Sequence, residues 1–260
     1  MRILEKFSLK GKVAIVTGGY GLYGQQIVSA LAEAGARVYT ASRNEEKNSA
    51  YAATMQKAGF DVKAVRVDQS DETSVLALRD CILKKEKKID VLVNNAVART
   101  VKNGWNSPVE SFSESMKINA TGLFIITRAF GDVMAAEGGG SIINIGSYMG
   151  MLGPDDAMYE GTEISGIVPD YFFHKGGMVN FTRFTASLYG PKQVRCNCLN
   201  LGGFYNNQDE KFVASYSKRT FLKRMANETD IMGAIVYLAS DASGYLTGAN
   251  IALDGGYSAK

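Results

Sequence analysis

Short runs rich in β-branched residues alternate along this chain with longer segments of helical period. Residues 13–17 have the composition of a buried strand, and in the segment 24–34 that follows, apolar residues recur at the spacing of one helix face. Parallel strands joined by crossover helices are buried on both faces, and the predicted strand 141–145 is apolar on both sides. The pattern predicts strands over 13–17, 37–41, 62–67, 90–94, 141–145, 193–199 and 250–253, and helices over 24–34, 45–58, 72–87, 108–136, 171–188 and 230–239.

This alternation indicates an α/β protein, and no linker rich in Pro, Gly or Ser divides it. We therefore expect residues 1–260 to form a single doubly wound domain of the Rossmann type, with a parallel sheet of about seven strands and helices on both faces. Two predicted loops, 148–170 and 202–209, are longer than this fold needs. Both follow the carboxyl ends of strands, where open α/β sheets bind ligands.

Composition excludes several classes of function. The net charge is +3, with Lys and Arg scattered along the chain, which gives no electrostatic footprint for nucleic acid. Three cysteines cannot form a disulfide framework, and the single histidine, His174, excludes a metal site built from several histidines. No apolar run is long enough to cross a membrane, and residues 1–10 lack the apolar core of a signal peptide. We expect a soluble protein of a reducing cytoplasm, without a metal, a membrane anchor or a nucleic-acid partner.

A glycine-rich turn joins the first predicted strand to the first predicted helix. It reads Thr17-Gly18-Gly19-Tyr20-Gly21-Leu22-Tyr23-Gly24. Glycines at this spacing allow a tight turn, a close approach of the backbone to a pyrophosphate, and close packing of helix on strand. The helix N-terminus then offers amide donors and a positive dipole to the phosphates. The turn predicts a dinucleotide site that includes Gly18, Tyr20, Gly21, Leu22 and Gly24.

The end of the second predicted strand indicates which dinucleotide binds. An acidic residue there would bind the ribose 2′-hydroxyl of NAD and repel a 2′-phosphate. In this chain Ser42 stands at that position and Arg43 follows it. A guanidinium pairs with phosphate through two hydrogen bonds, so the pattern favours NADP(H). NAD(H) is the alternative, in which Arg43 is only a solvated residue at the start of a helix.

A possible proton-transfer pair lies in the predicted helix 171–188. Among 13 tyrosines, only Tyr171 is followed four residues later by a lysine, Lys175. Residues four apart share one face of a helix, which brings the ammonium near the phenol. A neighbouring cation favours the phenolate, as general acid and base chemistry requires. His174 is expected to point away from this face and to be structural.

These features together resemble the short-chain dehydrogenase/reductase family over nearly the whole chain. The further matching pieces are Asp68, Asn94-Asn95-Ala96, Asn119 within Lys117-Ile118-Asn119-Ala120-Thr121-Gly122, Ser147, and the C-terminal Asp254-Gly255-Gly256. The resemblance implies that Tyr171 is the catalytic acid and base. It implies that Lys175 favours the phenolate and holds the nicotinamide ribose, and that Ser147 hydrogen-bonds the substrate oxygen. Asn119 would order a water molecule in the proton relay.

The same resemblance implies further cofactor contacts and an assembly. The contacts come from residues after predicted strands, with Asn206 where the family has threonine: Asp68, Gln69, Asn95, Ala96, Lys175, Gly202 and Asn206. Val97 also departs from the family, which commonly has glycine there. The resemblance further implies a homo-oligomer, a tetramer or a dimer.

The stretch between Ser147 and Tyr171 is longer than is usual in the family. We interpret it as an insertion around residues 148–170 in the active-site loop; the alternative is that the active site is lost. Residues 150–170 contain five carboxylates and no Lys or Arg, which favours polyhydroxyl or amine ligands over a bare anion. Arg99 and Lys102, after the fourth predicted strand, would supply cations if the substrate carries phosphate. A solvated loop or a subunit contact is the alternative. The candidate substrate residues are Arg99, Tyr159, Glu160 and Gly203.

A narrower resemblance concerns dehydrogenases encoded with nonulosonate (legionaminic-acid-type) and flagellin-modification genes. It depends on a proline shortly before Tyr171 and on three further pieces: Tyr159-Glu160-Gly161-Thr162, Cys198-Leu199 followed by Gly202-Gly203-Phe204, and Gln208. We therefore expect an NAD(P)(H)-dependent oxidoreductase that interconverts a secondary alcohol and a ketone on a sugar, sugar phosphate or nucleotide sugar. The alternatives are a 3-oxoacyl-carrier reductase and a non-catalytic protein that senses NADP.

Overall fold

Seven parallel strands form one sheet in the order β3-β2-β1-β4-β5-β6-β7 in a computed structural model of the chain. The structure describes residues 2–162, 164 and 168–259. The strands are β1 Val13–Thr17, β2 Arg37–Ser42, β3 Val62–Arg66, β4 Val91–Asn94, β5 Gly140–Ser147, β6 Val194–Leu201 and β7 Asn250–Leu253. The strand order reverses between β1 and β4, which is where doubly wound sheets open a crevice for ligands.

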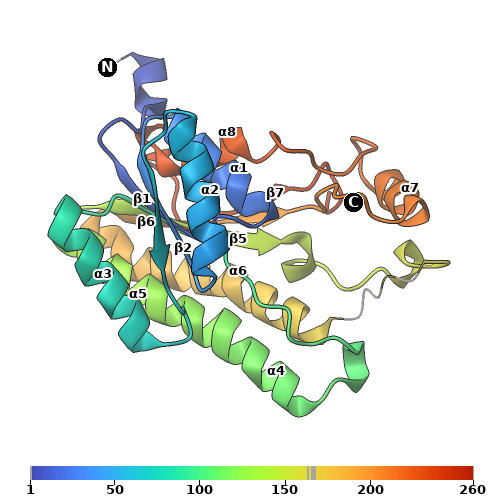
Figure 1. The fold of residues 1–260 in the computed structure, drawn as a ribbon. Helices are drawn as coiled ribbons and strands as arrows, with labels where there is room; N and C mark the ends of the chain where they lie inside the picture. The colour runs from blue at the N-terminus through green and yellow to red at the C-terminus, as the bar shows by residue number, and fades with distance from the viewer. Residues whose placement is uncertain (1, 163, 165–167, 260) are drawn as a thin grey trace.

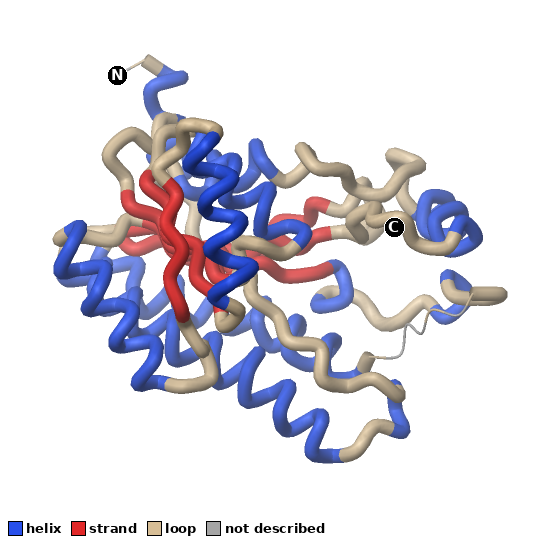
Figure 2. The backbone as a smooth tube through the Cα atoms, in the orientation of Figure 1, coloured by secondary structure: helices blue, strands red, loops and turns tan. Residues whose placement is uncertain are grey.

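Helices cover the sheet on both faces, which confirms the predicted fold class (Figure 1). They are α1 Leu22–Glu33, α2 Glu45–Lys57, α3 Glu72–Glu86, α4 Val109–Met116, α5 Gly122–Ala136, α6 Pro169–Tyr189, α7 Glu210–Arg219 and α8 Met232–Ala239. One apolar core lies between the sheet and α1, α2 and α8, and a second lies between the sheet and α3, α5 and α6. Figure 2 shows the strands between these two helical layers.

The predicted helix 108–136 is divided in the structure by a single π-helical segment, Lys117–Thr121, between α4 and α5. Such wide turns inside helices reposition side chains and are frequent at functional sites. Here the segment contains Asn119, of which only 4% is exposed. The sequence period could not reveal this extra residue in the turn, because the apolar pattern continues on both sides of it.

A buried polar contact fixes α6 against the middle of the sheet. Asn144 of β5 is fully buried, and its Oδ1 accepts a hydrogen bond of 2.8 Å from Asn94 Nδ2 of β4. Its Nδ2 donates to Thr182 Oγ1 of α6 over 2.9 Å. Buried polar groups are stable when their hydrogen bonds are made, and these bonds specify how α6 lies on β5. The helix that carries Tyr171 therefore has a defined position relative to the strand ends.

The long segment after β5 packs against α7 rather than extending into solvent. It contains two 3₁₀ turns, η4 Tyr148–Gly150 and η5 Asp156–Met158. Met158 is 1% exposed, and the Tyr159 ring stacks on Phe212 of α7 with centroids 5.5 Å apart. Part of the predicted loop, residues 163 and 165–167, lies outside the described residues. The described part forms a small separate core with α7 and the C-terminal Tyr257.

Candidate active site

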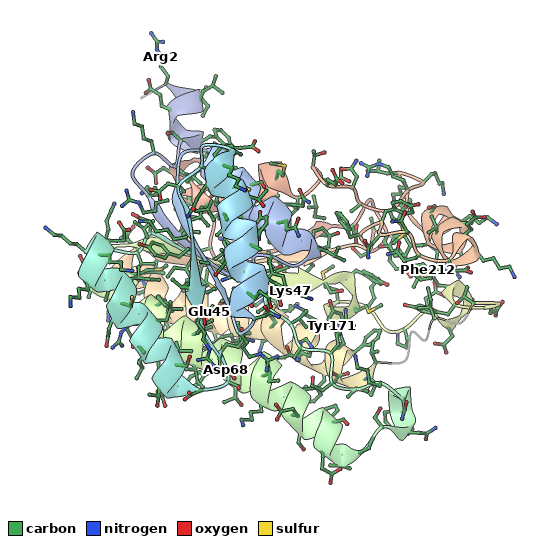
Figure 3. All side chains as sticks on the ribbon, viewed as in Figure 1. Arg2, Glu45, Lys47, Asp68, Tyr171 and Phe212 are labelled. Carbon is green, nitrogen blue, oxygen red and sulfur yellow. The ribbon has the colours of Figure 1, made fainter. Side chains whose placement is uncertain are left out.

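One cavity of about 660 Å³ lies at the carboxyl ends of the strands. Its lining runs from the start of α2, past the glycine turn and the N-terminal part of α6, to α7. In the view of Figure 3, Tyr171 lies between the start of α2, marked by Lys47, and α7, marked by Phe212. The volume is in the range of sites for small ligands and cofactors. The edge of the sheet predicted to bind a ligand therefore contains a suitable cavity.

Most of the residues predicted for the site line this cavity. Those of the cofactor set are Gly18, Tyr20, Gly21, Leu22, Gly24, Ser42, Arg43, Gln69, Asn95, Ala96, Lys175 and Gly202. Ser147 and Tyr171 of the catalytic set, and Arg99, Tyr159 and Gly203 of the substrate set, line it too. Asn119, Asp68, Asn206 and Glu160 do not contribute to the lining.

The glycine turn has the shape that a dinucleotide phosphate requires. Gly18 has a φ of +65°, and a Cβ there would lie 3.0 Å from the Cα of Ala96. A Cβ on Gly24 would lie 2.2 Å from the carbonyl oxygen of Gly18, so the helix can approach the turn only with glycine at this position. No side chain caps the N-terminus of α1 at Gly21. Its first amides are therefore available to an anion, and the turn fits a pyrophosphate.

An exposed cation, Arg43, follows the end of β2 in the lining of the same cavity. The Asn44 side chain caps α2 by accepting a 2.9 Å hydrogen bond from the Lys47 amide. Arg43 is exposed and lines the cavity, and no hydrogen bond or ion pair within the described residues uses its guanidinium. Within that same part of the chain no Asp or Glu lines the cavity. The residues present therefore fit a dinucleotide with a 2′-phosphate.

Tyr171 and Lys175 lie one turn apart near the start of α6. The helix begins at Pro169, whose fixed φ suits the first helical position. Lys175 is 3% exposed, and its Nζ donates a 2.5 Å hydrogen bond to the carbonyl oxygen of Ile145. Its Nζ lies 5.6 Å from the centre of the Tyr171 ring. Burial lowers the pKa of Lys175, and the charge of a Tyr171 phenolate acts in the opposite direction.

A second cation approaches the same phenol from the loop after β4. The Arg99 guanidinium lies 3.8 Å from the centre of the Tyr171 ring. Arg99 is exposed, and among the described residues its guanidinium makes no hydrogen bond or ion pair. A guanidinium on an aromatic face is held by the ring quadrupole while its N–H groups stay available to a ligand. All the charged residues in the described lining of the cavity are therefore cations: Arg43, Arg99 and Lys175.

The side chain of Asn119 is used entirely within the protein. Its Oδ1 accepts from the Ala98 amide over 2.8 Å, and its Nδ2 donates to the Ala98 carbonyl oxygen over 2.8 Å and to Ser115 Oγ over 3.0 Å. Asp68 accepts hydrogen bonds from the Ser70 amide and hydroxyl. At Asn206, the backbone amide donates to Gln208 Oε1, and it is Gln208 that lines the cavity.

The four carboxylates of the acidic loop that the structure describes do not line the cavity. Asp155 pairs with Arg219 of α7, and Asp170 is 2% exposed and accepts a hydrogen bond from Ser115. Asp156 and Glu160 are exposed and outside the lining. The fifth acid, Glu163, lies outside the described residues. The described carboxylates therefore give no support to the expected preference for polyhydroxyl or amine ligands over anions, which stays a prediction.

The expected orientation of His174 is wrong. It is 4% exposed, and its ring meets the Tyr171 ring edge-on with centroids 5.1 Å apart. Burial is the main reason why the pKa of His174 falls to about 3, so the imidazole is neutral. Residues three apart on a helix are neighbours, and a helical turn places position 174 over position 171. His174 is outside the cavity lining, in agreement with the structural role expected for it.

An aromatic wall, which sequence reasoning missed, closes the far end of the cavity. Tyr148, Phe212 and Tyr216 line it, with Tyr216 accepting a 2.5 Å hydrogen bond from the Gly203 amide. Phe212 and Tyr216 are four residues apart in α7, which begins at the capping residue Asp209. This spacing after a capping residue was the signal that could have predicted the helix. Tyr23 also lines the cavity, and its hydroxyl donates to the Gly202 carbonyl over 3.0 Å.

No helix among the described residues is long and apolar enough to span a membrane, and that part of the chain has no cluster of three or more potential metal ligands.

Comparison with known proteins gives consistent results along nearly the whole chain. The family model described as Enoyl-(Acyl carrier protein) reductase matches residues 23–258. A 7alpha-hydroxysteroid dehydrogenase from Clostridium sardiniense is 33% identical over 257 residues, covering 96% of this chain and 94% of that protein. A 2-dehydro-3-deoxy-D-gluconate 5-dehydrogenase from Escherichia coli is 31% identical over 266 residues, covering 99% and 100%.

Solved structures agree with these matches. A short-chain type dehydrogenase/reductase from Mycobacterium marinum is similar with a TM-score of 0.89 and 30% identity, over 100% of both chains. A gluconate 5-dehydrogenase from Burkholderia cenocepacia, in complex with NADP and tartrate, is similar with a TM-score of 0.88 and 27% identity, also over 100% of both chains. By its sequence and its fold, the chain belongs to the short-chain dehydrogenase/reductase family.

Proposed function

We propose that this protein is an NADP(H)-dependent oxidoreductase that interconverts a secondary alcohol and a ketone on a sugar-class substrate bearing a carboxylate or phosphate. The observation that carries the proposal is that Tyr171 and Lys175 share one cavity with the glycine turn and Arg43. A phenol that can exchange a proton and a dinucleotide site in the same cavity are what carbonyl reduction requires. Membership of the family supports the reaction class.

In the reducing direction, the Tyr171 hydroxyl gives its proton to the substrate carbonyl oxygen as that oxygen gains negative charge. Ser147, at the end of β5, donates a hydrogen bond to the same oxygen. Lys175 stabilises the resulting phenolate electrostatically, and the phenol regains a proton from solvent. When bound, the nicotinamide supplies the hydride for the carbonyl carbon. In the oxidising direction Tyr171 accepts the hydroxyl proton instead.

The preference for NADP(H) follows from the lining at the end of β2. The Arg43 guanidinium can pair with a 2′-phosphate. The described lining contains no acidic residue that would repel this phosphate. The similar gluconate 5-dehydrogenase structure, in complex with NADP, supports this choice.

The anionic part of the proposal depends on Arg99. Its guanidinium, which has no hydrogen-bond or ion-pair partner among the described residues, stands over the phenol at which the reacting oxygen must lie. A carboxylate or phosphate near the reacting carbon therefore has a partner there. The relative acting on 2-dehydro-3-deoxy-D-gluconate and the gluconate 5-dehydrogenase with tartrate support a sugar-acid substrate. The narrower resemblance to nonulosonate and flagellin-modification dehydrogenases stays a prediction, and it agrees with an acidic sugar.

The test is a survey of NADPH and NADP⁺ turnover at 340 nm with sugar acids, sugar phosphates, nucleotide sugars, neutral polyols and 3-oxoacyl thioesters. The variant Arg99→Ala is expected to raise KM for the anionic substrates about 10- to 100-fold, the loss of one charge-assisted contact. Lys102→Ala is the matched control, because Lys102 is an exposed cation in the same loop outside the cavity lining.

Three outcomes would contradict the proposal. Turnover confined to neutral polyols or cyclic alcohols would remove the anionic class. Turnover of thioesters alone would make the protein an acyl-carrier reductase. Tight binding of NADPH without turnover of any class would favour a cofactor-sensing protein.

A further inference from the structure

A closed circuit of contacts joins the start of α6 to the loop that carries Arg99. Ser115 Oγ of α4 donates a 2.5 Å hydrogen bond to Asp170 Oδ2 of α6. Asn119 Nδ2 donates to Ser115 Oγ over 3.0 Å, and the Asn119 amide group exchanges two 2.8 Å hydrogen bonds with the Ala98 backbone. Ala98 precedes Arg99, Asp170 precedes Tyr171, and Arg99 stacks on the Tyr171 ring.

The polar members of this circuit are withdrawn from solvent. Ser115 is 0% exposed, Asp170 2% and Asn119 4%. The two Ala98 bonds fix which end of the Asn119 amide is oxygen, and the remaining N–H then points to Ser115. The Ser115 hydroxyl accepts from Asn119 and must give its own proton to Asp170. Each bond therefore determines the direction of the next.

Arg99 depends on this circuit for its position. Within the described part of the chain its guanidinium has the Tyr171 ring and no hydrogen-bond or ion-pair partner. A long side chain held by one weak contact keeps its position only if its backbone is fixed. The Asn119 amide fixes that backbone at Ala98. Ser115 and Asp170 connect Asn119 to α6, the helix that carries Tyr171.

We propose that Ser115 and Asp170 are positioning residues that hold Arg99 over Tyr171 and thereby determine the preference for an anionic substrate. The inference rests on the proposed function, since it assigns the anion site to Arg99. Neither residue lines the cavity, so both act through Arg99 and not through contact with the substrate.

The experiment is a double-mutant cycle of Ser115→Ala and Arg99→Ala, read out by binding of two probes to the NADP⁺-saturated protein. D-gluconate carries a carboxylate, and D-glucitol is the neutral polyol of the same chain length. Ser115→Ala is expected to weaken D-gluconate binding about five- to tenfold, because small misplacements of a binding group lose much of its contribution. In the Arg99→Ala background it should have no further effect, and D-glucitol binding should not change.

Conservative variants separate positioning from loss of folding. In Asp170→Asn the side-chain oxygen can still accept the Ser115 proton, so D-gluconate binding should stay within about twofold of wild type. The double variant Ser115→Ala/Asp170→Ala leaves no unpaired buried carboxylate, and it should fold yet bind D-gluconate as Ser115→Ala does. Asp156→Ala removes an exposed acid of the same segment and is the matched control. Thermal unfolding of each variant verifies the fold.

The outcomes distinguish the two claims. If wild type prefers D-gluconate and Arg99→Ala abolishes the preference while Ser115→Ala retains it, the positioning claim is wrong and the proposed function stands. Additive effects in the cycle, or equal weakening of both probes, also overturn the positioning claim. If wild type shows no preference for D-gluconate, the anion site at Arg99 is wrong, and the positioning claim falls with it.

Discussion

Replacing Arg43 by alanine should change the affinity for one nicotinamide cofactor and leave the other unchanged. Arg43 is exposed in the cavity lining, and within the described residues its guanidinium makes no hydrogen bond or ion pair. The substitution therefore leaves no buried group without a partner, and surface changes of this kind alter stability by about 0.5 kcal/mol or less. Its effect should appear in binding alone.

The magnitude follows from the contact that is lost. A hydrogen bond between charged groups contributes about 1.5–3 kcal/mol, and two unit charges 4 Å apart near a protein surface interact by about 1–4 kcal/mol. At 1.4 kcal/mol per tenfold, the Kd for NADPH should rise about 10- to 150-fold. NADH has no 2′-phosphate, so its Kd should stay within about twofold, with no phosphate contact to lose.

The assay is titration of both reduced cofactors, followed by quenching of protein fluorescence, at one fixed ionic strength. Lys47→Ala is the matched control, because Lys47 is an exposed cation at the start of α2 outside the cavity lining (Figure 3). Its loss should change NADPH binding only slightly, through screened long-range charge. Equal weakening of NADPH and NADH, or weakening of neither, would refute the assignment of Arg43 to the 2′-phosphate.

Three further predictions concern stability, thiol reactivity and assembly. Glu86→Gln should lower the free energy of unfolding by about 1–3 kcal/mol at pH 7, because hydrogen bonds from Tyr39 and Arg37 hold the carboxylate. Burial acts to raise the pKa of Glu86, but these hydrogen bonds lower it below its ordinary value of 4.5. The difference in unfolding free energy between wild type and Glu86→Gln, measured by urea titration, should therefore shrink as the pH falls below that value. A difference that does not change with pH would show that the bonds contribute nothing. Of the three cysteines only Cys81 is exposed, so a thiol reagent at pH 8 should label one site rapidly in the native protein and three sites after denaturation. Rapid labelling of Cys196 and Cys198 in the native protein would contradict their burial in β6. Family resemblance implies a homo-oligomer, so light scattering should give a mass that is a multiple of 28.1 kDa. Phe184 of α6 is 60% exposed, and Phe184→Asp is expected to lower that mass. A monomeric wild type would contradict the prediction.

The sheet, its covering helices and the glycine turn could be predicted because local patterns encode them. Strand and helix periods follow burial on one or two faces, and Gly18 and Gly24 stand where backbone contacts exclude a side chain. Tyr171 and Lys175 could be paired because their spacing on a helix is fixed. Each of these inferences uses residues that are near in sequence or a regular repeat.

The parts that could not be predicted depend on contacts between distant segments. Asp155 pairs with Arg219, and Asp170 is buried against Ser115, so two of the loop's carboxylates are held by partners that composition cannot reveal. The contacts of the Asn119 amide could not be predicted for the same reason, since they join it to the Ala98 backbone across the site. Its role in a proton relay stays a prediction. Loop composition alone therefore could not show which charged residues of the described chain line the cavity.

The most direct test of the account is turnover of Tyr171→Phe with the best sugar-class substrate, followed at 340 nm beside NADPH binding. Phenylalanine keeps the ring on which Arg99 stacks and removes only the hydroxyl. Tyr205→Phe, at an exposed tyrosine outside the cavity lining, is the control. Loss of general acid catalysis should reduce kcat about 10²- to 10⁴-fold in Tyr171→Phe, with NADPH affinity unchanged and the control fully active. A Tyr171→Phe variant that turns over like wild type would contradict the assignment of the proton transfer, and with it the proposed mechanism.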